Sequence, residues 1–185
     1  MNNEMRWFNT ENDWGVISIA IHWLSALIVF WQFGFGLWMV ELSYYDAWYH
    51  KAPDLHKSIG LLFLMLTLIR LVSRQYNCIP KALINHTPRE QKIALIIHCL
   101  LYWFLFTVMI SGYLISTADG RAVAIFNWIE VPATLYGVDK QEDVAGVIHL
   151  WLAICLIGSA LLHILAAFKH HFFNQDRTLK RMFGL

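Results

Sequence analysis

The stretch that decides the fold runs from Gly146 to Phe168 and reads GVIHLWLAICLIGSALLHILAAF. Its length and apolar character predict a membrane-spanning helix, because about 20 apolar helical residues cross a bilayer. His149 and His163 lie fourteen residues apart within it. Fourteen helical residues return a side chain to within about 40° of its starting direction and rise about 21 Å. We therefore expect both imidazoles on one stripe of the helix, one near each membrane surface.

The composition of the whole chain is that of a membrane protein. Of its 185 residues, 58% are hydrophobic and 15% are charged, whereas a soluble domain typically has about 25% charged residues. The apolar segments cover residues 15–40, 55–72, 92–117 and 144–168. No run of alternating residues predicts a membrane strand, so we expect an all-α membrane protein: one four-transmembrane-helix bundle in a single domain over residues 1–185. The net charge is only +1 and no basic tract is present, which predicts no nucleic-acid partner.

Positive charges are unevenly divided between the two ends of the predicted helices. Ten of the 14 lysines and arginines fall on the side that holds both termini and the connection between the second and third segments. The other side holds Lys51, Lys57, Arg121 and Lys140. Because cytoplasmic loops are rich in Lys and Arg, both termini are predicted to be cytoplasmic. Residues 118–143 are then an external loop, expected to lie at the membrane interface.

Five histidines fall in or at the edge of the predicted spans, at two depths. Given the alternating direction of the helices, His22, His98 and His163 share the inner level, and His56 and His149 share the outer level. Polar residues within a bilayer are functional candidates. We expect the remaining histidines to be solvated: His50, His86, His170 and His171.

The chemistry of these two levels favours haem over zinc. A zinc site needs three or four ligands at one point, often with thiolate or carboxylate, whereas each level here offers only imidazoles on separate helices. Cys78, Cys99 and Cys155 form no CxxCH motif, so covalent c-type attachment is not predicted. Cys99 and Cys155 are expected to be small buried residues. Two opposed imidazoles suit a six-coordinate haem b, which favours electron transfer over oxygen chemistry.

An interval of fourteen residues recurs on every predicted helix. It links His22 with Gly36, His56 with Arg70, His98 with Gly112, and His149 with His163. Glycine at cofactor level lets a flat macrocycle approach the backbone, although close helix packing is the alternative explanation. Arg70 would reach the inner level, where haem propionates accept guanidinium hydrogens. The alternative for Arg70 is that its side chain extends to the cytoplasmic surface.

Several short motifs carry a resemblance to a known family. They are IHW at 21–23, HKSIG at 56–60 with Arg70 downstream, SGYLIS at 111–116, the His149 and His163 pair, KHHF at 169–172 and DRTLKRM at 176–182. With these motifs the chain resembles, over nearly its whole length, the bacterial cytochrome b561 family of di-haem membrane proteins. That family is related to the b-type cytochrome subunits of hydrogenases and formate dehydrogenases.

The resemblance implies a ligand pairing that spacing leaves open. In the family, the first-helix histidine pairs with the later histidine of the fourth helix, which gives His22 and His163 on the inner haem iron. The second-helix histidine pairs with the earlier one, which gives His56 and His149 on the outer haem iron. The implied cofactors are two haem b groups. His98 is left to bond a propionate or a neighbouring helix.

Two functions follow from the resemblance. The first is an electron shuttle of the bacterial inner membrane between the quinone pool and a periplasmic donor or acceptor. Some relatives oxidise superoxide and reduce ubiquinone, which requires a basic pocket for a small anion; Lys51, Lys57 and Arg121 are its candidates, with ordinary loop solvation as the alternative. The second is a membrane-anchor electron-transfer subunit that docks a periplasmic redox partner without turnover of its own. Whether the chain is an enzyme is therefore left open, and relatives can be homodimers.

Overall fold

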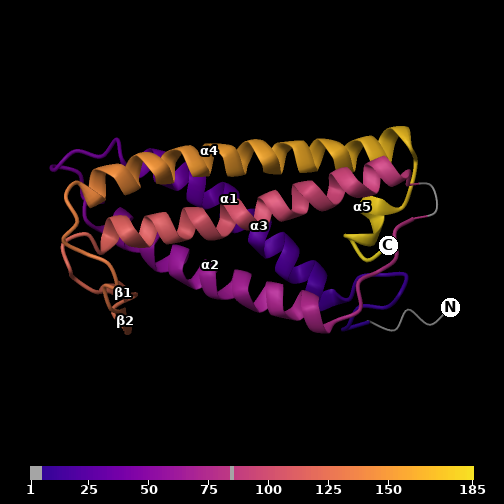
Figure 1. Cartoon of the computed structure of the whole chain (residues 1–185), viewed down its shortest axis with the longest axis horizontal. Helices are drawn as coiled ribbons and strands as arrows, with labels where there is room; N and C mark the ends of the chain where they lie inside the picture. The colour runs from indigo at the N-terminus through magenta and orange to yellow at the C-terminus, as the bar shows by residue number, and fades with distance from the viewer. Residues whose placement is uncertain (1–5, 84–85) are drawn as a thin grey trace.

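Four long helices form an antiparallel bundle in the computed structural model, which describes residues 6–83 and 86–185 (Figure 1). They are α1 (Val16–Met39), α2 (Lys51–Tyr76), α3 (Pro88–Ser116) and α4 (Gln141–Phe168). All four are long and apolar enough to cross a membrane. The predicted four-helix membrane bundle is confirmed.

Helix α2 is longer than the predicted span. Its 26 residues extend the apolar run of residues 55–72 by about one turn at each end. The added turns carry Asp54 near the start and Arg74 near the end. These charges end the apolar run from which the span was predicted. They do not end the helix, because an acid near the N-terminus and a base near the C-terminus complement the helix dipole.

Helix α3 also begins earlier than predicted, at a well-defined N-terminal cap. The Thr87 side chain accepts a hydrogen bond from the backbone N–H of Glu90, and the Glu90 carboxylate accepts one from the backbone N–H of Thr87. This reciprocal pair is a capping box. Pro88 follows at the first helical position, where its missing N–H leaves no bond unmade.

The two ends of the bundle differ in structure. The terminal end holds the connection between α2 and α3, a π-helical turn (Lys169–Phe173), the short helix α5 (Thr178–Arg181) and the described parts of both chain termini (Figure 1). The hairpin end holds the connection between α1 and α2 and an antiparallel pair of strands, β1 (Val123–Ile125) and β2 (Ile129–Val131). The termini thus share one end, and its cytoplasmic location stays a prediction from the charge distribution.

The β1–β2 hairpin lies within the segment that was predicted only as an interfacial loop. Its turn has positive φ at Phe126 (47°) and Asn127 (60°), as the tight turns of hairpins require. A Phe-Asn pair is a poor signal for such a turn, so sequence reasoning missed it. Ser58 of α2 holds the hairpin: its hydroxyl donates to the Ala124 carbonyl (3.3 Å) and accepts from the Phe126 N–H (3.1 Å).

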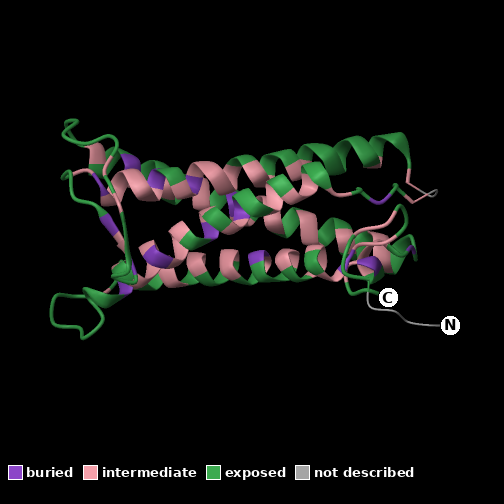
Figure 2. Cartoon of the chain, turned by 90° about the horizontal axis from the view of Figure 1, so that it is seen from below, coloured by how far each residue is buried: buried purple, intermediate pink, exposed green. Residues whose placement is uncertain are grey.

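The four helices do not pack evenly against one another. Helices α3 and α4 are in contact along much of their length, whereas α4 makes few contacts with α1 or with α2. Buried residues are sparse, and the outward faces of the helices are largely exposed (Figure 2). Exposed apolar side chains such as Leu27 and Leu162 are expected on faces that contact lipid. Cys99 and Cys155 are exposed on these faces, so the prediction that they are buried is wrong.

Candidate functional site

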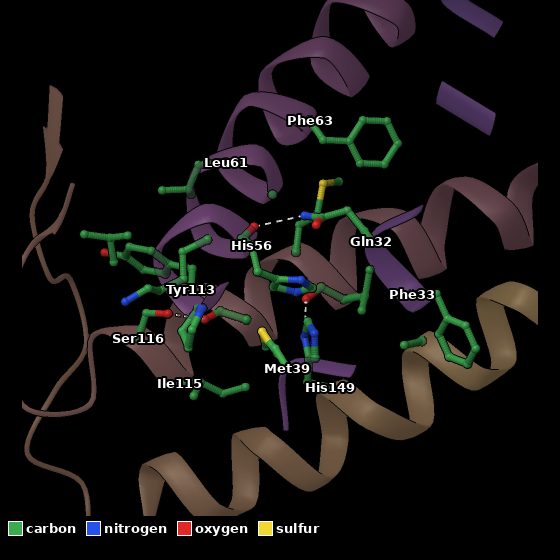
Figure 3. Close-up of a pocket in the computed structure, with 18 of the residues that line it drawn as sticks. Gln32, Phe33, Met39, His56, Leu61, Phe63, Tyr113, Ile115, Ser116 and His149 are labelled. Carbon is green, nitrogen blue, oxygen red and sulfur yellow. Dashed lines mark hydrogen bonds between the residues drawn. The ribbon is translucent and has the colours of Figure 1, made fainter. Parts of the chain in front are cut away.

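His56 and His149 face one another across the gap between α2 and α4 near the hairpin end. Their ring centroids lie 6.3 Å apart, and both rings line a cavity of about 430 Å³ (Figure 3). Pockets that hold small molecules and cofactors measure about 300–1,000 Å³. The sequence placed these two histidines at one level, and the structure brings them together.

A second histidine pair lies toward the terminal end. The ring centroids of His22 on α1 and His163 on α4 are also 6.3 Å apart. His98 on α3 lies closer to His163, with a centroid separation of 5.3 Å. All three inner-level histidines therefore meet at one level, and α4 contributes one imidazole to each of the two groups.

The separation of 6.3 Å in both pairs suits a metal ion between the rings. A transition-metal ion binds an imidazole nitrogen at about 2 Å, so two opposed nitrogens on one ion lie about 4 Å apart. Each ring centroid lies roughly 1 Å behind its nitrogen, which gives a centroid separation of about 6 Å for coaxial ligands on one ion. The spacing of the two rings at both levels therefore fits a bis-imidazole iron.

Hydrogen bonds fix the protonation state of His149. Its Nδ1 lies 2.8 Å from the Val108 carbonyl and 3.1 Å from the Ser111 hydroxyl. A carbonyl only accepts, so Nδ1 carries a proton, and Nε2 of the neutral imidazole keeps its lone pair. A hydrogen bond from the ring nitrogen that does not bind the metal is usual for a metal-binding histidine, because it orients the ring and raises its basicity.

His56 is held differently. Its Nδ1 is buried and has no hydrogen-bond partner among the described residues, which is costly for a polar atom. Its backbone carbonyl accepts a hydrogen bond from Nε2 of Gln32 (2.9 Å), a polar residue in the middle of α1. Sequence reasoning missed Gln32, although a lone amide inside an apolar span is itself a signal.

Two glycines make room for the outer imidazoles. A Cβ added to Gly36 on α1 would lie 3.2 Å from Cε1 of His56, and one added to Gly112 on α3 would lie 3.0 Å from Cε1 of His149. Both distances are tighter than ordinary Cβ contacts. The fourteen-residue interval thus predicted the right level for both glycines. Their nearest neighbours are the imidazole rings of the two candidate ligands, His56 and His149.

Arg70 reaches the inner level, as predicted, and contacts a histidine there. Its guanidinium nitrogen lies 3.0 Å from Nδ1 of His22, and the group sits over the Tyr102 ring at 5.9 Å. Arginine only donates, so this contact requires a lone pair on Nδ1 and leaves the proton of a neutral His22 on Nε2. Metal binding through Nε2 needs the opposite tautomer, and the Arg70 contact would then be released.

Two of the three predicted basic residues lie at the mouth of the outer cavity. Lys57 and Arg121 line it, whereas Lys51 does not. Each of the two is paired with an acid: Lys57 with Asp54 at 2.9 Å and Arg121 with Asp119. The hydrogen bond from the Arg121 side chain lowers the pKa of Asp119, so both members stay charged and their charges offset one another.

The histidines outside the spans differ from expectation in part. His50 is exposed before α2, as predicted. His86 and His170 are not solvated: their side chains are only 16% and 14% exposed, because both contact the carboxylate of Asp176. His171 is also partly buried. The prediction failed because the C-terminal tail folds back over the start of α3.

Comparison with known proteins identifies relatives along nearly the whole chain. The family model described as prokaryotic cytochrome b561 matches residues 13–185. The chain is 51% identical to cytochrome b561 homolog 2 of Escherichia coli (strain K12) over 180 residues, which cover 97% of this chain and 96% of the relative. It is 27% identical to the probable superoxide oxidase CybB of Yersinia pestis, covering 93% and 96% of the two chains. Cytochrome b562 of Cereibacter sphaeroides is 29% identical, with coverage of 90% and 92%.

Proposed function

The chain belongs to the prokaryotic cytochrome b561 family, and from this premise we propose that it carries electrons between the quinone pool and a periplasmic redox donor or acceptor through two haem b groups. Family membership and the four apolar helices make it a multi-pass electron-transfer protein of the bacterial inner membrane that uses haem b. The number of haems, the quinone and the periplasmic reactant belong to the proposal, as does the single domain over residues 1–185.

The observation that carries the proposal is the pair of matched histidine couples on one helix. His56 and His149 would bind the iron at the hairpin end, and His22 and His163 the iron at the terminal end. Both couples have centroids 6.3 Å apart, and the α4 ligands are separated by about 21 Å along the helix axis. Each couple joins helices that make few direct contacts, and the cavity lined by His56 and His149 offers space for a macrocycle at the hairpin end.

When bound, a bis-histidine haem b supplies a one-electron couple with no open coordination position. The chain holds and orients the ligands. Val108 and Ser111 keep the proton on Nδ1 of His149, and the glycines at positions 36 and 112 allow the rings to approach the neighbouring helices. Arg70, released from His22, would hold a propionate by charge-assisted hydrogen bonds.

Superoxide is the first candidate for the periplasmic reactant. A relative named as a probable superoxide oxidase aligns over 93% of the chain, and the outer cavity opens beside Lys57 and Arg121. In that case the protein is a superoxide:ubiquinone oxidoreductase: superoxide gives one electron and leaves as dioxygen, and two such electrons with two protons reduce a quinone to a quinol.

A membrane-anchor subunit is the second candidate, and the charge at the cavity mouth favours it. Each basic residue at the mouth is paired with a carboxylate, which weakens the field that would attract a small anion. Trp128 of the hairpin is 90% exposed, and exposed aromatic residues are common at protein interfaces. In this second candidate function, a periplasmic redox protein docks on the hairpin end and exchanges electrons with the outer haem.

Rapid kinetics on the purified haem-loaded protein separates these functions. The reduced protein is mixed with a short-chain ubiquinone, and the oxidised protein is pulsed with superoxide, while haem absorbance is followed. Rapid haem oxidation by quinone together with rapid reduction by superoxide supports the oxidoreductase. Rapid reaction with quinone but none with superoxide supports the anchor subunit. Inertness toward quinone contradicts both.

A further inference from the structure

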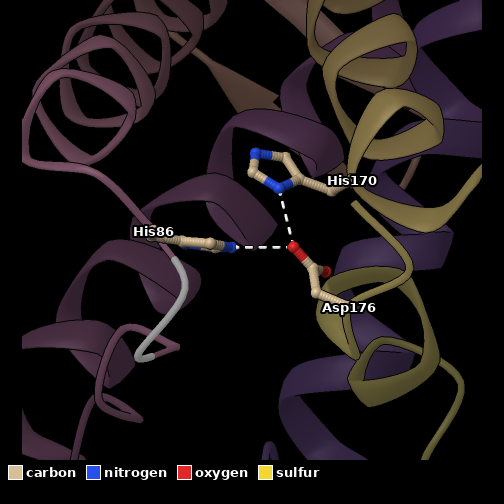
Figure 4. Close-up of side chains that lie close together, drawn as sticks. All are labelled: His86, His170 and Asp176. Atoms are coloured by element: carbon tan, nitrogen blue, oxygen red, sulfur yellow. Dashed lines mark hydrogen bonds and ion pairs between the residues drawn. The ribbon is translucent and has the colours of Figure 1, made fainter. Parts of the chain in front are cut away.

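A cluster of metal-ligating side chains lies at the terminal end, outside the proposed haem sites. His86 precedes α3, His170 lies in the π-helical turn after α4, and Asp176 precedes α5 (Figure 4). We propose that these three residues bind a divalent transition-metal ion with the ligand preference of Zn²⁺. The site uses the KHHF and DRTLKRM motifs, which the electron-transfer function leaves unexplained.

The three ligand atoms converge on one point. Oδ2 of Asp176 lies 2.8 Å from Nδ1 of His170 and 3.1 Å from Nε2 of His86, and all three atoms lie within 4.8 Å of one another. The two imidazole rings have centroids only 4.4 Å apart. Ligand atoms bound to a tetrahedral Zn²⁺ at about 2.0–2.1 Å lie roughly 3.3 Å from one another, so small shifts would admit the ion.

Local backbone structure holds two of the ligands in place. The π-helical turn closes with a bond from Asn174 N–H to the Lys169 carbonyl (3.2 Å), and Asp176 N–H donates to the His170 carbonyl (3.1 Å). His170 and Asp176 are therefore clamped on the two sides of one short loop. Single π-helical turns occur often at functional sites, and this one presents an imidazole to a carboxylate.

Burial and charge also suit a cation. The side chain of Asp176 is 3% exposed, beside imidazoles that are 16% and 14% exposed. The Asp176 carboxylate accepts a hydrogen bond from the Thr178 N–H (2.8 Å), and its other oxygen lies within hydrogen-bond distance of both His170 and His86. A buried charge needs a compensating partner, which a bound cation would supply.

Two polar partners compete for Nδ1 of His170, and a bound cation would replace both contacts. Nδ1 of His170 lies 2.8 Å from a carboxylate oxygen of Asp176, which only accepts, and 3.1 Å from Nδ2 of Asn174, which only donates. A neutral imidazole nitrogen satisfies one of these partners in either tautomer. A metal ion takes the lone pairs of all three ligand atoms at once and leaves the Asn174 amide free to turn.

Two imidazoles and one carboxylate form a donor set found in zinc sites with an open fourth position. The Thr178 hydroxyl, 3.2 Å from Nε2 of His86, or a water would complete the tetrahedron. The ion would tie the C-terminal tail to the start of α3. An ion pair beside it, between Lys169 and Glu90 at 2.7 Å, joins the same two segments, so the site would act as a structural clip.

Metal analysis of the haem-loaded protein tests the site. The protein is stripped with chelator, titrated with Zn²⁺ alone, and measured for bound zinc and for heat of binding. We expect about one tightly bound Zn²⁺ per chain. Asp176→Asn and His170→Ala should each weaken binding more than about 100-fold, beyond the usual effect of losing an outer partner of a metal ligand. His50→Ala, which alters an exposed histidine at the other end, should leave binding unchanged.

Haem absorbance serves as the folding check for every variant, because the three proposed zinc ligands bind no haem. X-ray absorption at the zinc edge of the wild-type protein gives a measurement that needs no variant. It should show nitrogen and oxygen neighbours with imidazole scattering and no sulfur. No saturable zinc binding, retained affinity in Asp176→Asn, or equal loss in His50→Ala would overturn the proposal.

Discussion

The two histidine couples have the same separation but different surroundings. At the hairpin end, the backbone carbonyl of Val108 and the Ser111 hydroxyl fix the proton of His149, and among the described residues no lysine or arginine side chain is hydrogen-bonded to either ring. At the terminal end, Arg70 contacts His22, and His98 crowds His163. His149 of the hairpin-end couple is oriented by hydrogen bonds, whereas the terminal-end couple lies beside an arginine and a third histidine.

This difference bears on the direction of electron flow. Hydrogen bonds, nearby charge and burial set the potential of a haem. A fixed positive charge favours the reduced iron, which carries one positive charge fewer. In a protein that holds both proposed haems, Arg70 should therefore raise the potential of the terminal-end haem relative to that of the hairpin-end haem, which favours electron flow from the hairpin end to the terminal end.

Removing one α4 histidine at a time should have the largest effect, because each variant should lose one of the two proposed haems. His149→Ala is expected to lose the hairpin-end haem and keep the other, and His163→Ala is expected to do the reverse. Each variant should fall from two haems per chain to about one, measured by haem extraction against protein mass. His98→Ala is the matched control and should retain both haems. Two haems with unchanged spectra in either α4 variant would rule out the assignment.

Gly112→Val should damage the hairpin end selectively. The added side chain would meet the His149 ring, since a Cβ alone comes within 3.0 Å of it, and overpacking of this kind costs about 1–3 kcal/mol. Haem content at the hairpin end and the thermal midpoint should both fall. Gly34→Val is the control, because a Cβ there meets nothing within 4 Å. Equal loss in the two variants would show that helix propensity, rather than ring contact, explains the effect.

Arg70→Gln should reduce the difference in potential between the two proposed haems. Loss of the cation is expected to lower the midpoint potential of one haem and to leave the other within error, as read from a redox titration. Arg74→Gln, one turn further along α2, should shift the potential much less. A shift of both haems by the same amount would mean that Arg70 acts through the fold as a whole.

Ser111→Ala should have the smallest effect. The Val108 carbonyl still accepts the His149 proton in this variant, so only the weaker of two hydrogen bonds is lost, worth about 0.5–1.5 kcal/mol. We expect both haems to be retained, with a small change in the potential of the hairpin-end haem. A loss of that haem would show that Ser111, and not the carbonyl, orients the ring.

Spacing and charge predicted much of this arrangement, for physical reasons. A helix has a fixed rise and rotation per residue, so the positions of His149 and His163 determine their levels, and the alternation of four spans determines which histidines meet them. Gly36 and Gly112 follow from the same periodicity. Such features depend on one helix at a time.

Features that depend on tertiary contacts escaped prediction. The burial of His86 and His170 arises because the C-terminal tail returns to α3, and nothing in the local sequence encodes that return. The β1–β2 hairpin has a turn without glycine, held by Ser58 from a distant helix. The pairing of Lys57 and Arg121 with acids depends on side-chain conformations that composition does not determine.

The most direct test of two stacked bis-histidine haems is made on the wild-type protein. Haem b per chain is measured by pyridine haemochrome assay, and the oxidised protein is examined by electron paramagnetic resonance. We expect two haems per chain, both low-spin with two imidazole ligands. One haem per chain, or a high-spin signal from an iron with an open position, would contradict this expectation.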